Sequence, residues 1–258
     1  MKKLVKICFI CLIAIMGGCS QSTSGKDDDS LVLTISAASS LQNVLEELRD
    51  EFKKNHREID IQFNFGASGS LSKQIEQGAP VDFFLSASND KFEKLNSLGL
   101  IQESATFISN ELVLITGKSG DVTLDKTEDL ASIEVEKISI GTPSIVPAGA
   151  YAKQALEHFN LWSKIENKII YAKDVRQVLT YVETGNVEAG FVYKTDAISS
   201  DRIQIIETVD AASHDLITYP IGILENTDSL SEAKQFYEFL QGEEAKEIWV
   251  EYGFTLIP

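Results

Sequence analysis

Cysteine and histidine are scarce in this sequence. Its 258 residues include three of each, and Cys8 and Cys11 lie in an apolar segment close to the N-terminus. If that segment is cleaved, only Cys19 remains, so no disulfide framework can form and apolar burial must hold the fold together. Without a cluster of histidine and cysteine, the sequence argues against a metal-cation site. We interpret the acidic run Asp27–Asp29 as solvated charge.

Basic side chains are also few. The chain has 23 Lys and Arg against 39 Asp and Glu, a net charge of −16, and removal of Lys2, Lys3 and Lys6 with a leader lowers it by three, to −19. This balance argues against nucleic acid and anionic membrane surfaces as partners, because both reward basic patches. It does not exclude an anionic ligand, since exposed charges are largely screened beyond about 8 Å at physiological salt.

The apolar run near the N-terminus is too short to span a bilayer, which needs about 20 apolar residues. It extends from Ile7 to Met16, follows three lysines and ends in small residues. This pattern predicts a secretory signal peptide over residues 1–18.

The cleavage region, Met16-Gly17-Gly18-Cys19, resembles a bacterial lipobox, although that motif usually has leucine where Met16 stands. We therefore predict that Cys19 is lipidated, that residues 19–30 form a polar tether, and that the protein is anchored on the outer face of the cell membrane. The alternative is a cleaved signal peptide followed by an incidental cysteine.

From Leu31 onward, short apolar runs typical of strands alternate with segments of helical periodicity. Alternation of this kind predicts an α/β fold with mostly parallel sheets flanked by helices. Strands are expected at 31–35, 59–65, 81–85, 111–116, 138–140, 169–171 and 189–193, and helices at about 41–52, 70–77, 91–98, 148–159 and 175–182.

Two further segments, 112–115 and 219–224, are extended and apolar. If both carry the chain between lobes, lobe one comprises residues 31–111 plus 222–258 and lobe two residues 116–218. Two lobes joined by two crossover strands would close on a ligand about a hinge.

Four expected strand-to-helix turns lie at 36–41, 66–71, 146–150 and 173–176; small residues fill the first three, hydroxyl groups occur in the first two, and the fourth reads Lys173-Asp174-Val175-Arg176. The start of a helix exposes backbone N–H groups without helical partners and carries partial positive charge, which favours anion binding. In open α/β sheets, ligands bind outside the carboxyl ends of the strands, where these turns lie. For any single turn the simpler interpretation is a helix N-cap.

Charged and aromatic side chains at these turns also have structural interpretations. Asp174 is expected to be an N-cap, because a carboxylate facing an anion would repel it. Arg176 is expected to be structural, paired with an acid, rather than a ligand. Tyr193, at a strand end, would by itself suggest a core aromatic residue.

Taken in order, several motifs resemble the molybdate-binding proteins of ABC importers. They cover nearly all of the chain after the leader: Ala37-Ala38-Ser39-Ser40-Leu41, Phe65-Gly66-Ala67-Ser68-Gly69-Ser70-Leu71, Gly78-Ala79-Pro80-Val81-Asp82, Val146-Pro147-Ala148-Gly149, Asp174-Val175-Arg176, Val192-Tyr193 and Tyr252-Gly253-Phe254. The resemblance implies a two-lobe, type II periplasmic-binding-protein-like fold. This chain has Gly69 and Ser70 where some relatives have Ser and Thr.

The resemblance also implies a set of ligand groups. Ser40, Ser68 and Tyr193 would donate hydroxyl groups to the oxyanion, and Ala148 and Val175 would donate backbone N–H groups. Ser39 is an additional candidate donor.

Such a pocket uses neutral donors, with no cofactor and no direct bond from protein to metal. The implied ligand is molybdate or tungstate, and their similar size predicts poor discrimination between them. Further implications are a monomer that captures a small oxyanion without catalysis, and partners comprising a membrane permease and its ATPase.

Three other classes of function were weighed. Another oxyanion, such as sulfate, is the principal alternative. A serine hydrolase is remote, because Ser70 stands where the nucleophile elbow around Ser68 requires glycine, and His56, His158 and His214 neighbour no triad motif. A nucleotide-binding loop at Gly117-Lys118-Ser119 fails, because Leu112 occupies the place of its first glycine.

Overall fold

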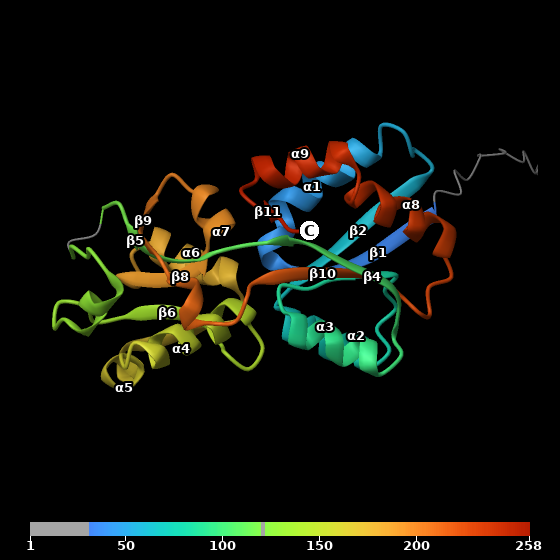
Figure 1. The fold of residues 1–258 in the computed structure, drawn as a ribbon. Coiled ribbons are helices and arrows are strands. Elements are labelled where there is room, and N and C mark those ends of the chain that lie inside the picture. Colours follow the sequence, from blue (N-terminus) through green and yellow to red (C-terminus); the bar gives the residue numbers. More distant parts are fainter. Residues whose placement is uncertain (1–30, 120–121) are drawn as a thin grey trace, which may run out of the picture.

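The computed structural model describes residues 31–119 and 122–258 (Figure 1). The predicted signal peptide, lipidation site and tether lie outside the described residues. Within the described part of the chain, no helix has both the length and the apolar character needed to cross a membrane.

The first of two sheets has the strand order β11-β4-β10-β3-β1-β2. Strands β2, β1 and β3 run parallel, whereas β10 is antiparallel to both β3 and β4, and β11 is antiparallel to β4. The parallel strands are those joined by helical crossovers, which parallel pairing requires. The strands are β1 (Leu31–Ala38), β2 (Ile59–Gly66), β3 (Phe83–Leu85), β4 (Ile101–Ser109), β10 (Thr218–Leu224) and β11 (Thr255–Leu256).

The second sheet has the order β7-β6-β8-β5-β9. Strands β7, β6 and β8 are parallel, and β5 is antiparallel to β8 and β9. Both sheets are therefore mixed, and each contains a three-stranded parallel part. The strands are β5 (Leu112–Gly117), β6 (Ile138–Gly141), β7 (Ile169–Ala172), β8 (Ala189–Tyr193) and β9 (Ile203–Thr208).

Helices cover both faces of each sheet (Figure 1). Around the first sheet, α1 (Gln42–Phe52), α8 (Leu230–Leu240) and α9 (Glu243–Glu251) pack together on one face, and α2 (Ser68–Glu76) and α3 (Asn89–Ser97) pack on the other. Around the second sheet, α6 (Val175–Glu183) and α7 (Lys194–Ile198) lie opposite α4 (Pro147–His158) and α5 (Trp162–Ile165). Short 3-10 turns add η1 (Ser39–Leu41), η2 (Thr127–Ala131), η3 (Glu166–Lys168) and η4 (Ala211–Ser213).

The chain passes between the sheets at Asn110 and Glu111, which separate β4 from β5, and again just before β10. The two passages lie side by side, because the Asn110 N–H donates to the Ile217 carbonyl at 3.1 Å. The segments 112–115 and 219–224 were expected to cross between the lobes. Each lies instead within one sheet, 112–115 in β5 and 219–224 in β10, and their apolar side chains are buried. Below, lobe one denotes the first sheet with its helices, and lobe two the second.

Candidate ligand-binding site

A small cavity lies between the lobes. Its lining comes from the residues that follow the carboxyl ends of all six parallel strands, three from each lobe. This is where an open α/β sheet is expected to bind a ligand. The lining residues are Ala38, Ser39, Ser40, Gly66, Ala67, Ser68, Ala87, Val146, Pro147, Ala148, Val175 and Tyr193.

The two serines expected as ligands reach this cavity from lobe one. Ser40 lies in η1 directly after β1, and Ser68 is the first residue of α2, directly after β2. Both are buried, and each hydroxyl oxygen contacts another group: Ser68 Oγ accepts from the Ala87 N–H at 2.9 Å, and Ser40 Oγ lies 3.2 Å from the Tyr219 hydroxyl. Ser39, the additional candidate, also lines the cavity.

Two helix starts in lobe two bring backbone N–H groups to the same cavity. Val175 is the first residue of α6, and Ala148 follows Pro147 at the start of α4. First-turn amides have no acceptor within their helix, and the hydrogen bonds among the described residues include none from these two. Asp174 is the N-cap of α6, as expected: its Oδ1 accepts from the Gln177 N–H at 2.8 Å.

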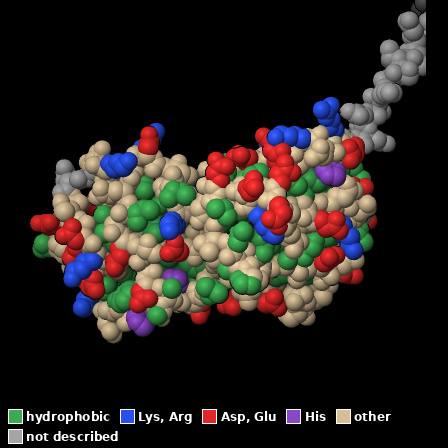
Figure 2. Space-filling view, turned by 45° about the horizontal axis from the view of Figure 1, so that its top comes forward, with side chains coloured by type: hydrophobic (Ala, Val, Ile, Leu, Met, Phe, Trp, Pro, Cys, Tyr) green, Lys and Arg blue, Asp and Glu red, His purple; other side chains and the backbone are tan. Residues whose placement is uncertain are grey.

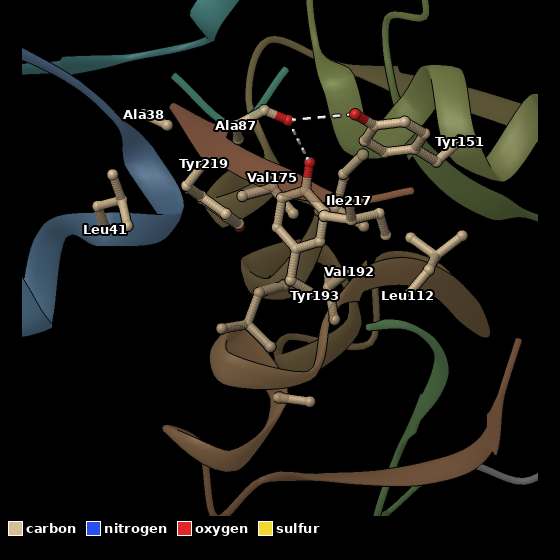
Figure 3. Packing of buried hydrophobic residues seen from close by; sticks show 14 of the residues in the cluster. Ala38, Leu41, Ala87, Leu112, Tyr151, Val175, Val192, Tyr193, Ile217 and Tyr219 are labelled. Carbon is tan, nitrogen blue, oxygen red and sulfur yellow. Dashed lines mark hydrogen bonds between the residues drawn. The ribbon is translucent and has the colours of Figure 1, made fainter. Parts of the chain in front are cut away.

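Tyr193 ends β8, and its hydroxyl group lies across the cavity from its own lobe. This hydroxyl is 3.5 Å from the Ala87 carbonyl oxygen, and the Tyr151 hydroxyl is at the same distance (Figure 3). Burial raises the pKa of Tyr193 well above its ordinary value, and nearby acidic groups add to the rise. The hydroxyl therefore stays protonated and can donate to an anion.

Arg176 does not line the cavity and has a structural role, as expected. Its Nε lies 3.1 Å from Asp196 Oδ1 and donates to the Ser39 carbonyl at 3.4 Å. Asp196 is completely buried, and among the described residues neither of its carboxylate oxygens has a hydrogen bond, so the contact with Arg176 is an ion pair. Burial raises the Asp196 pKa to about 6, although Arg176 opposes the rise. The residues that line the cavity carry no charged side chain.

The lobes touch where α2 meets the loop before α4. The Gly69 N–H donates to the Ile145 carbonyl at 2.9 Å. A Cβ atom at Gly69 would lie 2.7 Å from that carbonyl oxygen, nearer than real Cβ contacts come. The absence of a side chain at Gly69 therefore allows the two lobes to approach each other this closely.

Sequence reasoning missed Ala87. Its N–H donates to the Ser68 hydroxyl oxygen and its carbonyl accepts from two tyrosines, so the backbone of one residue contacts groups from both sides of the cavity. The signal was present: Ser86-Ala87-Ser88 separates β3 from α3, with the same small and hydroxyl-bearing residues as the other strand-to-helix turns.

A wider, open depression lies at the opposite edge of the second sheet, at the end of β5. It is lined by side chains of both charges, including Lys118, Glu183 and Arg202, and contains Gly117-Lys118-Ser119. No residue that lines this depression lies at the start of a helix, so the depression lacks the converging first-turn N–H groups of the cavity between the lobes. None of the three histidines lines the cavity between the lobes. His56 lies after α1, which ends at Phe52.

Comparison with known proteins identifies the family. A model of the bacterial extracellular solute-binding proteins matches residues 33–255. This chain belongs to that family. The chain is 50% identical over 244 residues to YvgL of Bacillus subtilis (strain 168), and the match covers 93% of each chain. YvgL is provisionally described as an ABC transporter substrate-binding lipoprotein.

Two further relatives carry more specific names. The chain is 35% identical over 260 residues, 99% of each chain, to the molybdate-binding protein ModA of Haemophilus influenzae. The solved periplasmic molybdate-binding protein of Azotobacter vinelandii is 27% identical, with a TM-score of 0.80 over 88% of this chain and all of that one. These comparisons confirm the two-lobe, type II periplasmic-binding-protein fold expected from the sequence.

The structure brings all the expected ligand residues together. Ser40, Ser68, Ala148, Val175 and Tyr193, with Ser39, line one cavity between the lobes. Their contacts with a ligand stay a prediction.

Proposed function

We propose that this solute-binding protein captures molybdate or tungstate outside the cytoplasm and delivers it to the permease and ATPase of an ABC importer. The observation that carries the proposal is the cavity itself, where hydroxyl groups and first-turn amides converge from both lobes and no charged side chain lines the wall. Relatives named molybdate-binding proteins span almost the whole chain, which supports molybdate over other anions.

Neutral donors favour a fully deprotonated anion. Hydrogen phosphate keeps a proton near neutral pH, and its O–H group would face donors and remain unpaired, at a cost of about 1–3 kcal/mol. Molybdate, tungstate and sulfate avoid this cost. Hydrogen bonds to a charged acceptor contribute roughly 1.5–3 kcal/mol each, so five such donors are enough for micromolar to nanomolar affinity, about −8 to −12 kcal/mol.

The remaining parts of the proposal follow from this mode of binding. The protein acts as a monomer without catalysis or cofactor, and its hydrogen bonds reach the oxygen atoms of the anion, so no protein atom bonds the metal.

We propose that Cys19 carries the lipid, supported by the lipobox-like sequence and by the description of YvgL as a lipoprotein. A Cys19→Ser variant should then appear in the medium or soluble fraction instead of the membrane fraction.

Titration calorimetry of the chain without its signal peptide tests the function. Molybdate and tungstate should bind with similar affinity, sulfate more weakly and phosphate weakest. Sulfate binding more tightly than molybdate would establish the principal alternative, a protein for another tetrahedral oxyanion. Absence of binding heat for all four anions, together with an unchanged melting temperature, would reject an oxyanion carrier.

A further inference from the structure

Tyr219, at the start of β10, is completely buried and lies beside the cavity without lining it. Its hydroxyl oxygen contacts two side chains from different parts of the chain: Ser40 Oγ at 3.2 Å and Asn110 Nδ2 at 3.2 Å. Figure 3 shows the Tyr219 ring between Leu41 and Tyr193. Its ring also packs edge-on against that of Tyr193, with centroids 5.8 Å apart, a contact that Tyr219→Phe keeps, whereas the Tyr219 hydroxyl contacts the cavity lining at Ser40.

The orientation of the Asn110 side chain is fixed by its other contacts. Its Oδ1 accepts from the Glu111 N–H at 2.9 Å, and its Nδ2 donates to Thr195 Oγ1 at 2.9 Å. The second hydrogen of the same Nδ2 points to Tyr219. An amide nitrogen has no lone pair with which to accept, so Asn110 is the donor in its bond with Tyr219.

The direction of the next bond follows. Because the Tyr219 oxygen accepts from Asn110, Ser40 Oγ is the one partner left for the Tyr219 hydrogen among the residues that the structure describes. If Ser40 donated instead, the Tyr219 hydrogen would be buried without an acceptor, which is unfavourable. Ser40 therefore accepts from Tyr219, and its own hydrogen is left for the cavity that Ser40 lines.

We infer that Asn110 and Tyr219 fix the Ser40 hydroxyl as a hydrogen-bond donor toward the ligand, and that Tyr219 is a positioning residue for selection of fully deprotonated oxyanions. This inference rests on the proposed function. Ser68 is constrained in the same sense, because its oxygen already accepts from the Ala87 N–H. A ligand O–H group consequently meets serine hydrogens where it needs an acceptor.

A double-mutant cycle tests the relay. Affinity is measured by calorimetry for wild type, Tyr219→Phe, Ser40→Ala and the double variant, using whichever of molybdate, tungstate, sulfate and phosphate binds wild type most tightly. The relay predicts that Tyr219→Phe weakens binding about tenfold when Ser40 is present, the scale of one hydrogen bond, and has almost no effect in the Ser40→Ala background. Tyr237→Phe, at a buried tyrosine of α8, is the matched control and should leave affinity unchanged.

Selectivity provides a second readout, which a purely structural role would not change. Without Tyr219 as donor, the Ser40 hydroxyl is free to turn and present a lone pair to a ligand O–H group, so the ratio of phosphate to sulfate affinity should rise in Tyr219→Phe, as measured by competition against the tightest anion. Sulfate and phosphate have similar size, so the ratio reports protonation. Equal losses in both backgrounds, or an unchanged ratio, would overturn the relay.

Folding is monitored by thermal unfolding without anion. If Tyr219→Phe does not fold, Asn110→Ala serves instead, because without the Asn110 donor the Tyr219 oxygen can accept from Ser40 and withdraw the Ser40 hydrogen from the ligand, with no change of charge. Its effect on affinity should likewise depend on Ser40, and an effect independent of Ser40 would reject the relay. Failure of molybdate to bind wild type would reject the proposed function alone, since the cycle can be run with another anion.

Discussion

The hydroxyl groups in the cavity combine two features, burial and a hydrogen bond that orients the group. Ser68 is the clearest example: it is fully buried, and its oxygen is held by the Ala87 N–H. Tyr193 is held less firmly, because its hydroxyl lies 3.5 Å from the Ala87 carbonyl oxygen, at the outer limit of hydrogen bonding. Such groups can turn their hydrogens to an anion with little reorganisation.

Replacement of Ser68 should therefore weaken binding strongly. Ser68→Ala removes one hydrogen bond to a charged acceptor, so molybdate affinity should fall about ten- to hundredfold by calorimetry. Tyr193→Phe should cost less, because its hydroxyl exchanges one acceptor for another on binding. Ser72→Ala is the matched control: Ser72 is buried on the same helix and bonds the Lys91 carbonyl away from the cavity. Equal affinities for Ser68→Ala and Ser72→Ala would contradict the assignment.

Asp196 predicts a particular pH dependence of stability. Burial raises its pKa from 3.8 to about 6 in the folded protein, so between pH 4 and 6 the native state holds more protons than the unfolded state. Stability from this group is therefore greatest below pH 4 and is lost as pH rises through 6, by about 3 kcal/mol for two pKa units. Asp174 adds to the rise and Arg176 opposes it.

Chemical denaturation of wild type and Asp196→Asn isolates this contribution, because all other titrating groups are common to both. The difference in unfolding free energy, wild type minus variant, should decrease from pH 4 to pH 6.5. Parallel curves over that range would show that the carboxyl group titrates normally.

Among the elements, the strand-to-helix turns are what the sequence predicts best. Apolar runs and helical periodicity locate β1, β2, β6, β7 and β8 and the helices that follow the first four of these strands, since each signal lies within a few neighbouring residues. The short helix α7 after β8 was not predicted. The motif resemblance then assigns Ser40, Ser68, Ala148 and Val175 within these turns, and the structure brings the four residues into one cavity.

Features that depend on distant residues could not be predicted in this way. The contact of Ser40 with Tyr219 joins positions 179 residues apart, and nothing in either local sequence indicates it. The antiparallel strands β4, β5 and β10 make the sheets mixed, whereas periodicity reveals strands and not their partners. The apolar run 219–224 for the same reason suggested a crossover, although it lies between β3 and β4.

Two glycines near helix starts allow different close contacts: Gly69 allows a contact between the lobes, and Gly149 allows packing within one lobe. A Cβ atom at Gly69 would meet Ile145 of the other lobe at 2.7 Å, and one at Gly149 would lie 1.8 Å from the Gly141 carbonyl of its own lobe. Overpacking typically costs 1–3 kcal/mol. Gly69→Ala should thus weaken molybdate binding about tenfold while the ligand-free melting temperature is kept, because each lobe retains its packing.

Gly149→Ala is the comparison, and it should lower the ligand-free melting temperature, because α4 can no longer pack against β6. Calorimetry and thermal unfolding on the same samples separate the two outcomes. A large loss of melting temperature in Gly69→Ala, with unchanged affinity, would show that its contact with Ile145 serves folding and not closure.

The whole molecule carries strong negative charge, −16 for the full chain, and yet is proposed to capture a dianion. Acidic side chains are interspersed with basic ones over both lobes on the face shown in Figure 2. Because the net charge repels the ligand at a distance while neutral donors hold it at contact, affinity and association rate respond to different features.

Salt should therefore accelerate capture. Raising ionic strength screens the repulsion, so the molybdate association rate measured by stopped-flow fluorescence should increase severalfold between low salt and physiological salt. A rate that falls with salt would indicate a local cationic path to the cavity, opposite to the arrangement described here.

The central claim is that uncharged groups from both lobes surround the anion. A crystal structure of the protein grown with molybdate tests this claim most directly. We predict the ion in the cavity between the lobes, with its oxygen atoms accepting from the Ser40, Ser68 and Tyr193 hydroxyls and from the N–H groups of Ala148 and Val175. A molybdate ion held by lysine or arginine side chains, or bound outside this cavity, would contradict the account.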